Sequence, residues 1–230
     1  MKRLVVHVEG PTEFAFVREL LAPHLLSCGY DAVWPRLVGN AQLARRTGGI
    51  KGWLAVRQDI IHHLRENRGC RATLMVDYYG LPQSGEKAWP GRAAAEKMPW
   101  PLGAKHLAQR LLDDVQTRIE GEVRRQFLPF VTMHEFEGLL FSDCPSFARA
   151  ILQPDLLPAL QLIRDSFGSP EAINDSPATA PSKRIEALVA GYSKPVQGMR
   201  AARTIGLAVM RRECTHFDAW LTELEQWLRD

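Results

Sequence analysis

Four carboxylates stand close behind apolar runs of this 230-residue sequence. Carboxylates that are held together repel one another, and their pKa rises unless a cation neutralises them. Hard oxygen ligands of this kind suit Mg²⁺ or Mn²⁺, which keep several waters and bind substrate phosphates. We therefore interpret these acids as candidate ligands of a divalent metal ion: Glu9, Glu13, Asp77 and Glu135.

Three of the acids follow segments that predict buried β-strands. In open α/β sheets, ligands bind outside the carboxyl ends of parallel strands. If the strands are neighbours, the acids that follow them reach one edge of the sheet, and Glu13 joins them from the first turn of a helix. The runs are short, apolar and β-branched, and they cover Leu4–Val8, Ala72–Val76 and Phe127–Met133.

Each acid also has an ordinary structural explanation. An acid in the first turn of a helix is stabilised by roughly 0.3–1 kcal/mol through the helix dipole, and aspartate commonly begins a turn. The coincidence of three strand ends favours the metal site, but both interpretations stay open at this point.

Helical and strand patterns alternate through the first half of the chain. A further strand is predicted at residues 31–38, at the edge of the sheet because it contains Pro35, and Pro23 is expected to kink or split the first helix. The order β-α-β-α-β predicts an α/β fold with a mostly parallel, three-layer core. We predict this core over residues 1–143 and a helical C-terminal part, residues 144–230, packed on it. Apolar spacing predicts helices at residues 12–27, 53–65 and 104–119.

Composition sets broad limits on the function. An apolar fraction of 46% with 24% charged residues is ordinary for a globular protein, and a net charge of +3 neither requires nor excludes nucleic acid. The four cysteines contain no C-x-x-C pair, which is typical of reduced thiols in a cytosolic protein. No stretch approaches the ~20 apolar residues that span a bilayer, and the N-terminal apolar run is too short for a signal peptide. We expect a cytoplasmic protein without membrane contact.

Two other features could contact nucleic acid. Trp89 and Trp100 lie in a long segment rich in Gly and Pro, residues 80–103, and could stack on bases or, more commonly, pin that segment to the core. A set of basic residues could bind a phosphate backbone, although such a run is more often a solvated helix face. It comprises Arg45, Arg46, Lys51, Arg57, Arg65, Arg68 and Arg71.

The motifs around the acids resemble a known group of proteins. The segment "VEGPTE" and the acid after "ATLMV" resemble the Toprim fold, which is shared by topoisomerases, primases and nucleases of the overcoming-lysogenization-defect type. The fuller set is similar to a bacterial family of Toprim-like proteins of undetermined function, and it runs over nearly the whole chain. It comprises "VEGPTEFAFVRELL", "VDYYGLP", "HEFEGLLFSD", "PEAIND", "APSKRIEAL" and "C-x-H-F-x-x-W-L".

The resemblance implies divalent-metal chemistry on phosphodiesters. In Toprim proteins the glutamate after the first strand is a metal ligand or general acid/base, which corresponds to Glu9. In the related phage-defence nucleases a second glutamate four residues on also serves the metals, which corresponds to Glu13, and the aspartate after a later strand corresponds to Asp77. The sequence departs from this pattern at Tyr79, where the D-x-D motif has its second acid. Tyrosine is a poor Mg²⁺ ligand at neutral pH, so one ligand is missing or comes from elsewhere.

Glu135 and Glu137 are the candidates for that ligand. If residues 135–141 are α-helical, the two side chains lie roughly 200° apart and cannot easily serve one ion; Glu135 lies nearer the strand end and is preferred. Lys183 is a further catalytic candidate, because the helix dipole disfavours its charge at a helix start and a bound phosphate would relieve that conflict. An exposed basic pair with Arg184 explains Lys183 equally well.

These expectations predict a divalent-metal-dependent nuclease that hydrolyses phosphodiester bonds of DNA or RNA, with Mg²⁺ or Mn²⁺ as cofactor. By analogy with related defence systems, the resemblance further implies that this chain is the effector of a phage-defence system and that its partner ATPase is encoded nearby. The alternative is a non-catalytic Toprim-like interaction subunit of such a complex, which Tyr79 supports. The sequence leaves the substrate and the oligomeric state open, a homo-oligomer included. The predicted catalytic residues are Glu9, Glu13, Asp77, Glu135 and Lys183, of which the four acids are the metal ligands.

Overall fold

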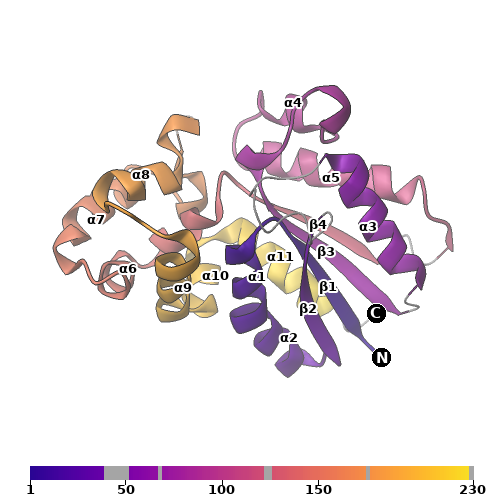
Figure 1. The fold of residues 1–230 in the computed structure, drawn as a ribbon, viewed down its shortest axis with the longest axis horizontal. Helices are drawn as coiled ribbons and strands as arrows, with labels where there is room; N and C mark the ends of the chain where they lie inside the picture. The colour runs from indigo at the N-terminus through magenta and orange to yellow at the C-terminus, as the bar shows by residue number, and fades with distance from the viewer. Residues whose placement is uncertain (39–51, 67–68, 122–125, 175–176, 228–230) are drawn as a thin grey trace.

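Four parallel strands form the central sheet of the protein, in the order β2-β1-β3-β4. The structure, a computed structural model, describes residues 1–38, 52–66, 69–121, 126–174 and 177–227 (Figure 1). The predicted α/β core with a parallel sheet is confirmed, and β2 lies at an edge, as Pro35 indicated. The strands are β1 (Arg3–Val8), β2 (Ala32–Leu37), β3 (Cys70–Asp77) and β4 (Phe127–Thr132).

Helices cover both faces of the sheet. Alternate residues of each strand point to opposite faces: Phe130 of β4 packs with the first helix layer, and its neighbour Val131 packs with the second. Both faces are therefore buried, which explains why the strands are nearly continuous apolar runs. The first layer contains α1 (Pro11–Phe16), α2 (Ala22–Cys28) and α11 (Thr215–Gln226). The second contains α3 (Trp53–Glu66) and α5 (Leu102–Gln116).

The first predicted helix is one helical run with a wider turn inside it. A π-helical segment, Val17–Leu21, joins α1 to α2. Pro23 lacks a backbone N–H and its ring would collide with the carbonyl one turn earlier, so a wider turn before it relieves the conflict. Pro23 is therefore accommodated by a wider turn without a break in the helix, and Gly29 ends the helix in the left-handed conformation at φ 116°.

The Gly- and Pro-rich segment is an ordered cover over the α3–α5 face. It contains the short helix α4 (Arg92–Ala95), and the buried Arg92 places its guanidinium 3.8 Å from the ring centroid of Tyr78. Trp89 is 2% exposed, and its ring centroid lies 5.0 Å from that of Trp53. Trp89 therefore anchors the segment to the core and does not offer its ring to bases.

The chain after residue 143 is helical, as predicted, but it shares a core with the sheet. In Figure 1 the helices α6 to α10 form a lobe beside the strands, whereas α11 returns to the sheet. One cluster of buried side chains continues from β1 and β4 into this lobe. The boundary at residue 143 therefore separates types of secondary structure and not two cores. The lobe contains α6 (Cys144–Ala150), α7 (Leu157–Asp165), α8 (Pro181–Leu188), α9 (Met199–Ile205) and α10 (Leu207–Glu213).

Among the described residues, no helix combines the length and the apolar character that crossing a membrane requires.

Candidate functional site

β1 and β3 are the strands at which the connections of the sheet change direction. The chain leaves β1 for β2 on one side and then crosses to β3 on the other. Ligands of open α/β sheets bind at the carboxyl ends of such a pair. Glu9 directly follows β1 and Asp77 ends β3, and the backbone N–H of Asp77 donates a hydrogen bond to Glu9 Oε2 at 3.3 Å. The structure thus brings these two acids together at the switch point.

Two of the other acids reach the same edge from separate segments. Glu13 is buried in the first turn of α1, and a Cβ atom at Gly10 would lie 3.1 Å from its Oε2. Glu135 follows β4, and its Oε2 accepts a hydrogen bond from the N–H of Ser182 at 2.8 Å, in the first turn of α8. The four predicted metal ligands therefore come from the ends of three strands and from one helix, as the sequence pattern required.

Glu135 and Glu137 do not diverge. Phe136–Ser142 is a 3₁₀ helix, and Glu135 precedes it in an extended conformation with φ −152° and ψ 157°. The expected separation of roughly 200° assumed an α-helix, and that assumption is wrong. Lys194 Nζ lies 2.8 Å from Glu137 Oε2 and 3.9 Å from Glu135 Oε1, so both carboxylates flank one ammonium group. Glu137, which is fully buried, therefore belongs to the cluster.

Burial and mutual repulsion raise the pKa of these carboxyl groups. The pKa of Glu9 rises to about 7, first through burial and then through Glu13. Burial, followed by Glu13 and Glu9, raises the pKa of Asp77 well above its ordinary value. Burial also raises the pKa of Glu137 to about 7, although Lys194 opposes the shift. A cluster that holds protons at neutral pH lacks positive charge, and a divalent cation would supply it.

Lys194 is the functional candidate that the sequence analysis missed. It begins a π-helical turn, Lys194–Gly198, in a segment without any periodic pattern or motif that pointed to it. Burial lowers its pKa, but the neighbouring carboxylates, Glu137 foremost, outweigh burial and raise the pKa above its ordinary value. Lys183 is exposed instead, and its Nζ donates to Glu186 Oε2 at 2.7 Å. The lysine among the acids is therefore Lys194, and Lys183 has a surface partner.

The negative charge of the cluster and its unpaired carboxylate oxygen suit a divalent ion, but the carboxylates do not already form a complete coordination shell. Glu137 Oε1 is buried, and no described residue donates a hydrogen bond to it. Among the described side chains, however, no three of these carboxylates place one oxygen each within 4.8 Å of one another. An ion here would take one or two carboxylates directly and complete its shell with water or substrate oxygens, which is how Mg²⁺ is usually bound.

Tyr79 packs beside the cluster and stays protonated. Burial raises its pKa to about 12, and its ring centroid lies 5.3 Å from that of His134. A neutral phenol does not replace a carboxylate ligand. The acid that the Toprim pattern has at this position is therefore replaced, if at all, by Glu135 or Glu137.

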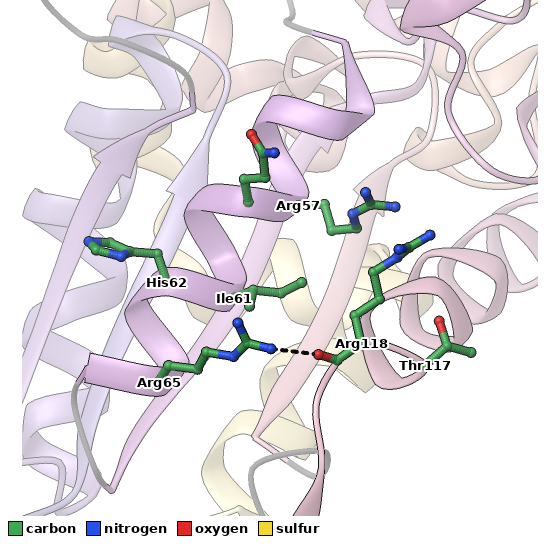
Figure 2. A pocket seen from close by; sticks show the side chains of 7 residues that line it. Arg57, Ile61, His62, Arg65, Thr117 and Arg118 are labelled. Atoms are coloured by element: carbon green, nitrogen blue, oxygen red, sulfur yellow. Dashed lines mark hydrogen bonds between the residues drawn. The ribbon is translucent and has the colours of Figure 1, made fainter.

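The basic residues expected at a nucleic-acid surface lie partly on α3, away from the acids. Arg45, Arg46, Lys51 and Arg68 are outside the described residues. A hollow of about 560 Å³ separates α3 from the end of α5, and Figure 2 shows Arg57 and Arg65 extending from α3 toward it, with Arg118 on its other side. Arg57 is paired with Asp114 at 2.9 Å, and Arg65 donates to the carbonyl of Arg118.

The position of this hollow follows from the connections of the sheet. The end of α3 leads into the start of β3, and the chain after α5 leads into the start of β4. The carboxylates lie at the opposite ends of these strands. The hollow and the carboxylate cluster are therefore two separate features.

The comparisons with known proteins assign a family but no activity. No curated protein and no solved structure matches the chain. A single family model covers nearly its whole length, from the last residue of β1 to a residue of α11, so every acid of the cluster and Lys194 lie inside the match. The chain belongs to the family described as a domain of unknown function (DUF4276), whose model matches residues 8–225.

Proposed function

We propose that this protein is a divalent-metal-dependent phosphodiesterase that acts on nucleic acid, with Mg²⁺ or Mn²⁺ as its cofactor. One observation carries the proposal: Glu9 and Asp77 are joined by a hydrogen bond at the carboxyl ends of neighbouring parallel strands, next to Glu135 and Glu137, which flank Lys194. The resemblance of the surrounding motifs to Toprim nucleases supports the same chemistry.

The acids at the strand ends would hold the ion. The ligands are drawn from Glu9, Glu13, Asp77 and Glu135, and Glu137 is available through its unsatisfied Oε1. When bound, the ion would lower the pKa of a water and neutralise charge on the leaving oxygen. One or two ions are compatible with five carboxylates.

The side chains of the site also have roles of their own. In the metal-free protein the pKa of Glu9 is raised to about 7. A carboxyl group in that range accepts or returns a proton at neutral pH when it does not itself bind the ion. The ammonium group of Lys194 would stabilise negative charge that develops on the phosphoryl oxygens. Glu137 holds that ammonium in place through its 2.8 Å ion pair.

The cellular setting is part of the same proposal. By analogy with related phage-defence nucleases, this chain would be a cytoplasmic effector of a phage-defence system and would work with an ATPase encoded nearby. The hollow lined by Arg65 and Arg118 provides a second contact for a phosphate backbone.

A cleavage assay tests the proposal. Plasmid DNA, single-stranded DNA and tRNA are incubated with Mn²⁺ or Mg²⁺ and with wild type, Glu9→Gln or the control Glu186→Gln, whose acid pairs with Lys183 on the surface. We expect metal-dependent cutting by wild type and control, and a loss of at least about 100-fold in Glu9→Gln. Equal cutting by Glu9→Gln and wild type would remove this site from the reaction. If no protein cuts, the assay is repeated with the neighbouring ATPase.

The rival function is a non-catalytic interaction subunit with a weakened site. Two observations favour it: the Lys194–Glu137 ion pair already neutralises part of the cluster, and Tyr79 stands where a ligand is expected. This function predicts no cutting by the complex with the ATPase and no specific Mn²⁺ binding that depends on Glu9.

A further inference from the structure

A second group of metal-ligand side chains lies between α2 and α11, outside the carboxylate cluster. His24 and Cys28 are four residues apart on α2, so they share one face of that helix. Glu225 reaches them from α11, 201 residues further along the chain than His24. The Nε2 atom of His24 lies 2.6 Å from Glu225 Oε1 and 3.8 Å from Cys28 Sγ. All three ligand atoms lie within 4.8 Å of one another, which no other group of three His, Cys, Asp or Glu side chains among the described residues achieves.

Both helices that carry the three ligands are anchored in the core. Leu25, between the two α2 ligands, and Leu224, next to the α11 ligand, are fully buried in the same cluster. Tyr30, just after α2, donates its hydroxyl to the carbonyl of Leu224 at 2.8 Å. The ligands therefore project from packed elements, and adjustment is confined to their side chains.

The donor set matches zinc. A thiolate, an imidazole and a carboxylate are the ligand types that zinc prefers, and tetrahedral zinc bonds of roughly 2.0–2.3 Å place ligand atoms roughly 3.3–3.5 Å apart. The His24–Cys28 distance of 3.8 Å is already close to this range. His24 and Glu225 now share a hydrogen bond of 2.6 Å and would have to separate by roughly 0.7 Å. Both side chains are partly exposed, so a small rotation provides that space.

We propose that His24, Cys28 and Glu225 bind one zinc ion, which ties the C-terminal helix α11 to α2 and leaves a fourth position for water or another ligand. Cys28 is exposed at the end of α2, whereas Cys70, Cys144 and Cys214 are buried. The ion therefore reaches the site from solvent without any opening of the core.

Arg211 sets the charge around this zinc site. Its guanidinium donates to both oxygens of Glu225, at 2.5 and 3.3 Å, and also to Asp218. Such outer contacts orient a ligating carboxylate. They also place a positive charge next to the ion, so the affinity for zinc is lower than that of a site with an unpaired glutamate.

Arg211 also provides an alternative explanation of these contacts, an ion-pair network without a metal ion. The contacts of Glu225 with His24 and Arg211 form a complete ion-pair network by themselves. That network explains two of the three ligands, but it has no need of a thiol four residues from His24. Cys28 is therefore the residue on which the test must depend.

Cobalt substitution gives a readout that the carboxylate cluster cannot produce. Metal-free full-length protein is titrated with Co²⁺ and then with Zn²⁺ in excess Mg²⁺, which competes at the acids. Wild type should develop a thiolate-to-cobalt charge-transfer absorption that stoichiometric zinc removes. Cys28→Ser should lack this absorption, and both Cys28→Ser and His24→Ala should bind zinc at least about 100-fold more weakly, since even outer-shell changes cost 10–100-fold.

The control is His62→Ala, which removes an exposed histidine that also has an acid four residues away, Glu66. It should bind cobalt and zinc as wild type does. Far-UV circular dichroism verifies that Cys28→Ser, a change at an exposed side chain, keeps the fold. Absence of the charge-transfer band in wild type, or equal zinc affinity in wild type and Cys28→Ser, would overturn the proposal. Neither result depends on the nuclease assay, because these residues lie outside the carboxylate cluster.

Discussion

The backbone N–H of Asp77 donates a hydrogen bond to the side chain of Glu9 at 3.3 Å. This bond joins the ends of β1 and β3, the neighbouring strands at which the chain connections of the sheet change direction. Asp77 Oδ1 in turn accepts a hydrogen bond from the N–H of Phe136 at 2.9 Å, in the segment that follows β4. The acids themselves thus link the ends of β1, β3 and β4. A site built on strand ends has less freedom than one built on loops, which suits a reaction that requires fixed distances.

Replacing Lys194 by Met should impair cleavage far more than replacing Lys183. Lys194 Nζ lies 2.8 Å from Glu137 Oε2 inside the cluster, whereas the ammonium group of Lys183 is exposed and paired with Glu186. We expect Lys194→Met to lower the cleavage rate by roughly 100- to 1000-fold, the usual cost of removing one group that stabilises developing charge. Lys183→Met should retain nearly the full rate. Steady-state rates on the substrate that wild type cuts provide the measurement, and equal losses in the two variants would contradict the assignment.

Adding a methyl group at Gly80 should disturb the site without unfolding the protein. A Cβ atom there would lie 2.9 Å from Glu9 Oε1, the end of a side chain that can move away. Gly80→Ala should therefore displace the Glu9 carboxylate and weaken Mn²⁺ binding, measured by calorimetry, while the free energy of unfolding changes by less than about 1 kcal/mol.

The matched control for Gly80→Ala is Gly168→Ala. A Cβ atom at Gly168 has no described heavy atom within 4 Å, so this variant should bind Mn²⁺ as wild type does. Unchanged Mn²⁺ affinity in Gly80→Ala would show that Glu9 is not a ligand in its present position.

The sequence predicted the acids at the strand ends for a clear reason. Short apolar, β-branched runs of the kind before Glu9 and Asp77 are typical of buried strands, and parallel strands place their carboxyl ends at one edge. The apolar spacing of residues 12–27 predicted the helix that follows β1 and carries Glu13. The order of the strands, and hence the switch point between β1 and β3, came only from the structure, because no local pattern encodes which strands pair.

The positions of Lys194 and Glu137 in the cluster could not be predicted from the sequence. Lys194 stands 57 residues from Glu137 in a turn without helical or strand periodicity, so only tertiary packing reveals its position. Glu135 is preferred from the sequence because it lies nearer the strand end, and an α-helix over "EFEGLLF" would keep Glu137 from serving the same ion. In the structure this segment is a 3₁₀ helix that begins after an extended Glu135, and three residues per turn change which side chains share a face.

The raised pKa values of the site carboxyl groups predict that their contribution to the stability of the metal-free protein falls as the pH rises. Glu9 and Glu137 have folded pKa values of about 7 against ordinary values of 4.5. Between these values the folded chain holds more protons at these two groups than the unfolded chain, so their contribution to the free energy of unfolding falls with rising pH. Burial lowers the pKa of His7 to about 3 and those of His134 and His216 to about 4, which acts in the opposite direction, so the difference between wild type and Glu9→Gln isolates the acid.

Urea unfolding of wild type and Glu9→Gln in the presence of a chelator measures the two free energies of unfolding from about pH 4.5 to pH 8. Glu9→Gln, which cannot ionise, should show a shallower fall, and Mn²⁺ should restore stability above pH 7 because it binds the ionised acids. A pH dependence of the same shape in wild type and Glu9→Gln would contradict the assigned electrostatics.

The helix α11 should be essential to the core. Trp220 stacks on Phe130 of β4 with ring centroids 4.4 Å apart, and its indole N–H donates to Thr73 Oγ1 at 3.0 Å. Trp220→Ala should cost about 3–5 kcal/mol of unfolding free energy. Leu162→Ala, at a position of α7 that is 71% exposed, should cost less than about 0.5 kcal/mol. Urea midpoints measure both, and a small effect at Trp220 would mean that the sheet folds without the C-terminal helix.

The most direct test of the account is the position of a bound ion. A crystal of the full chain is soaked in Mn²⁺, and the anomalous signal of manganese locates the ion without reference to any assumed ligand. We expect a peak between Glu9 and Asp77, in contact with at least one of their carboxylates or with waters that they hold. A clear manganese peak elsewhere and none at these two acids would contradict the shared cation on which the proposed chemistry depends.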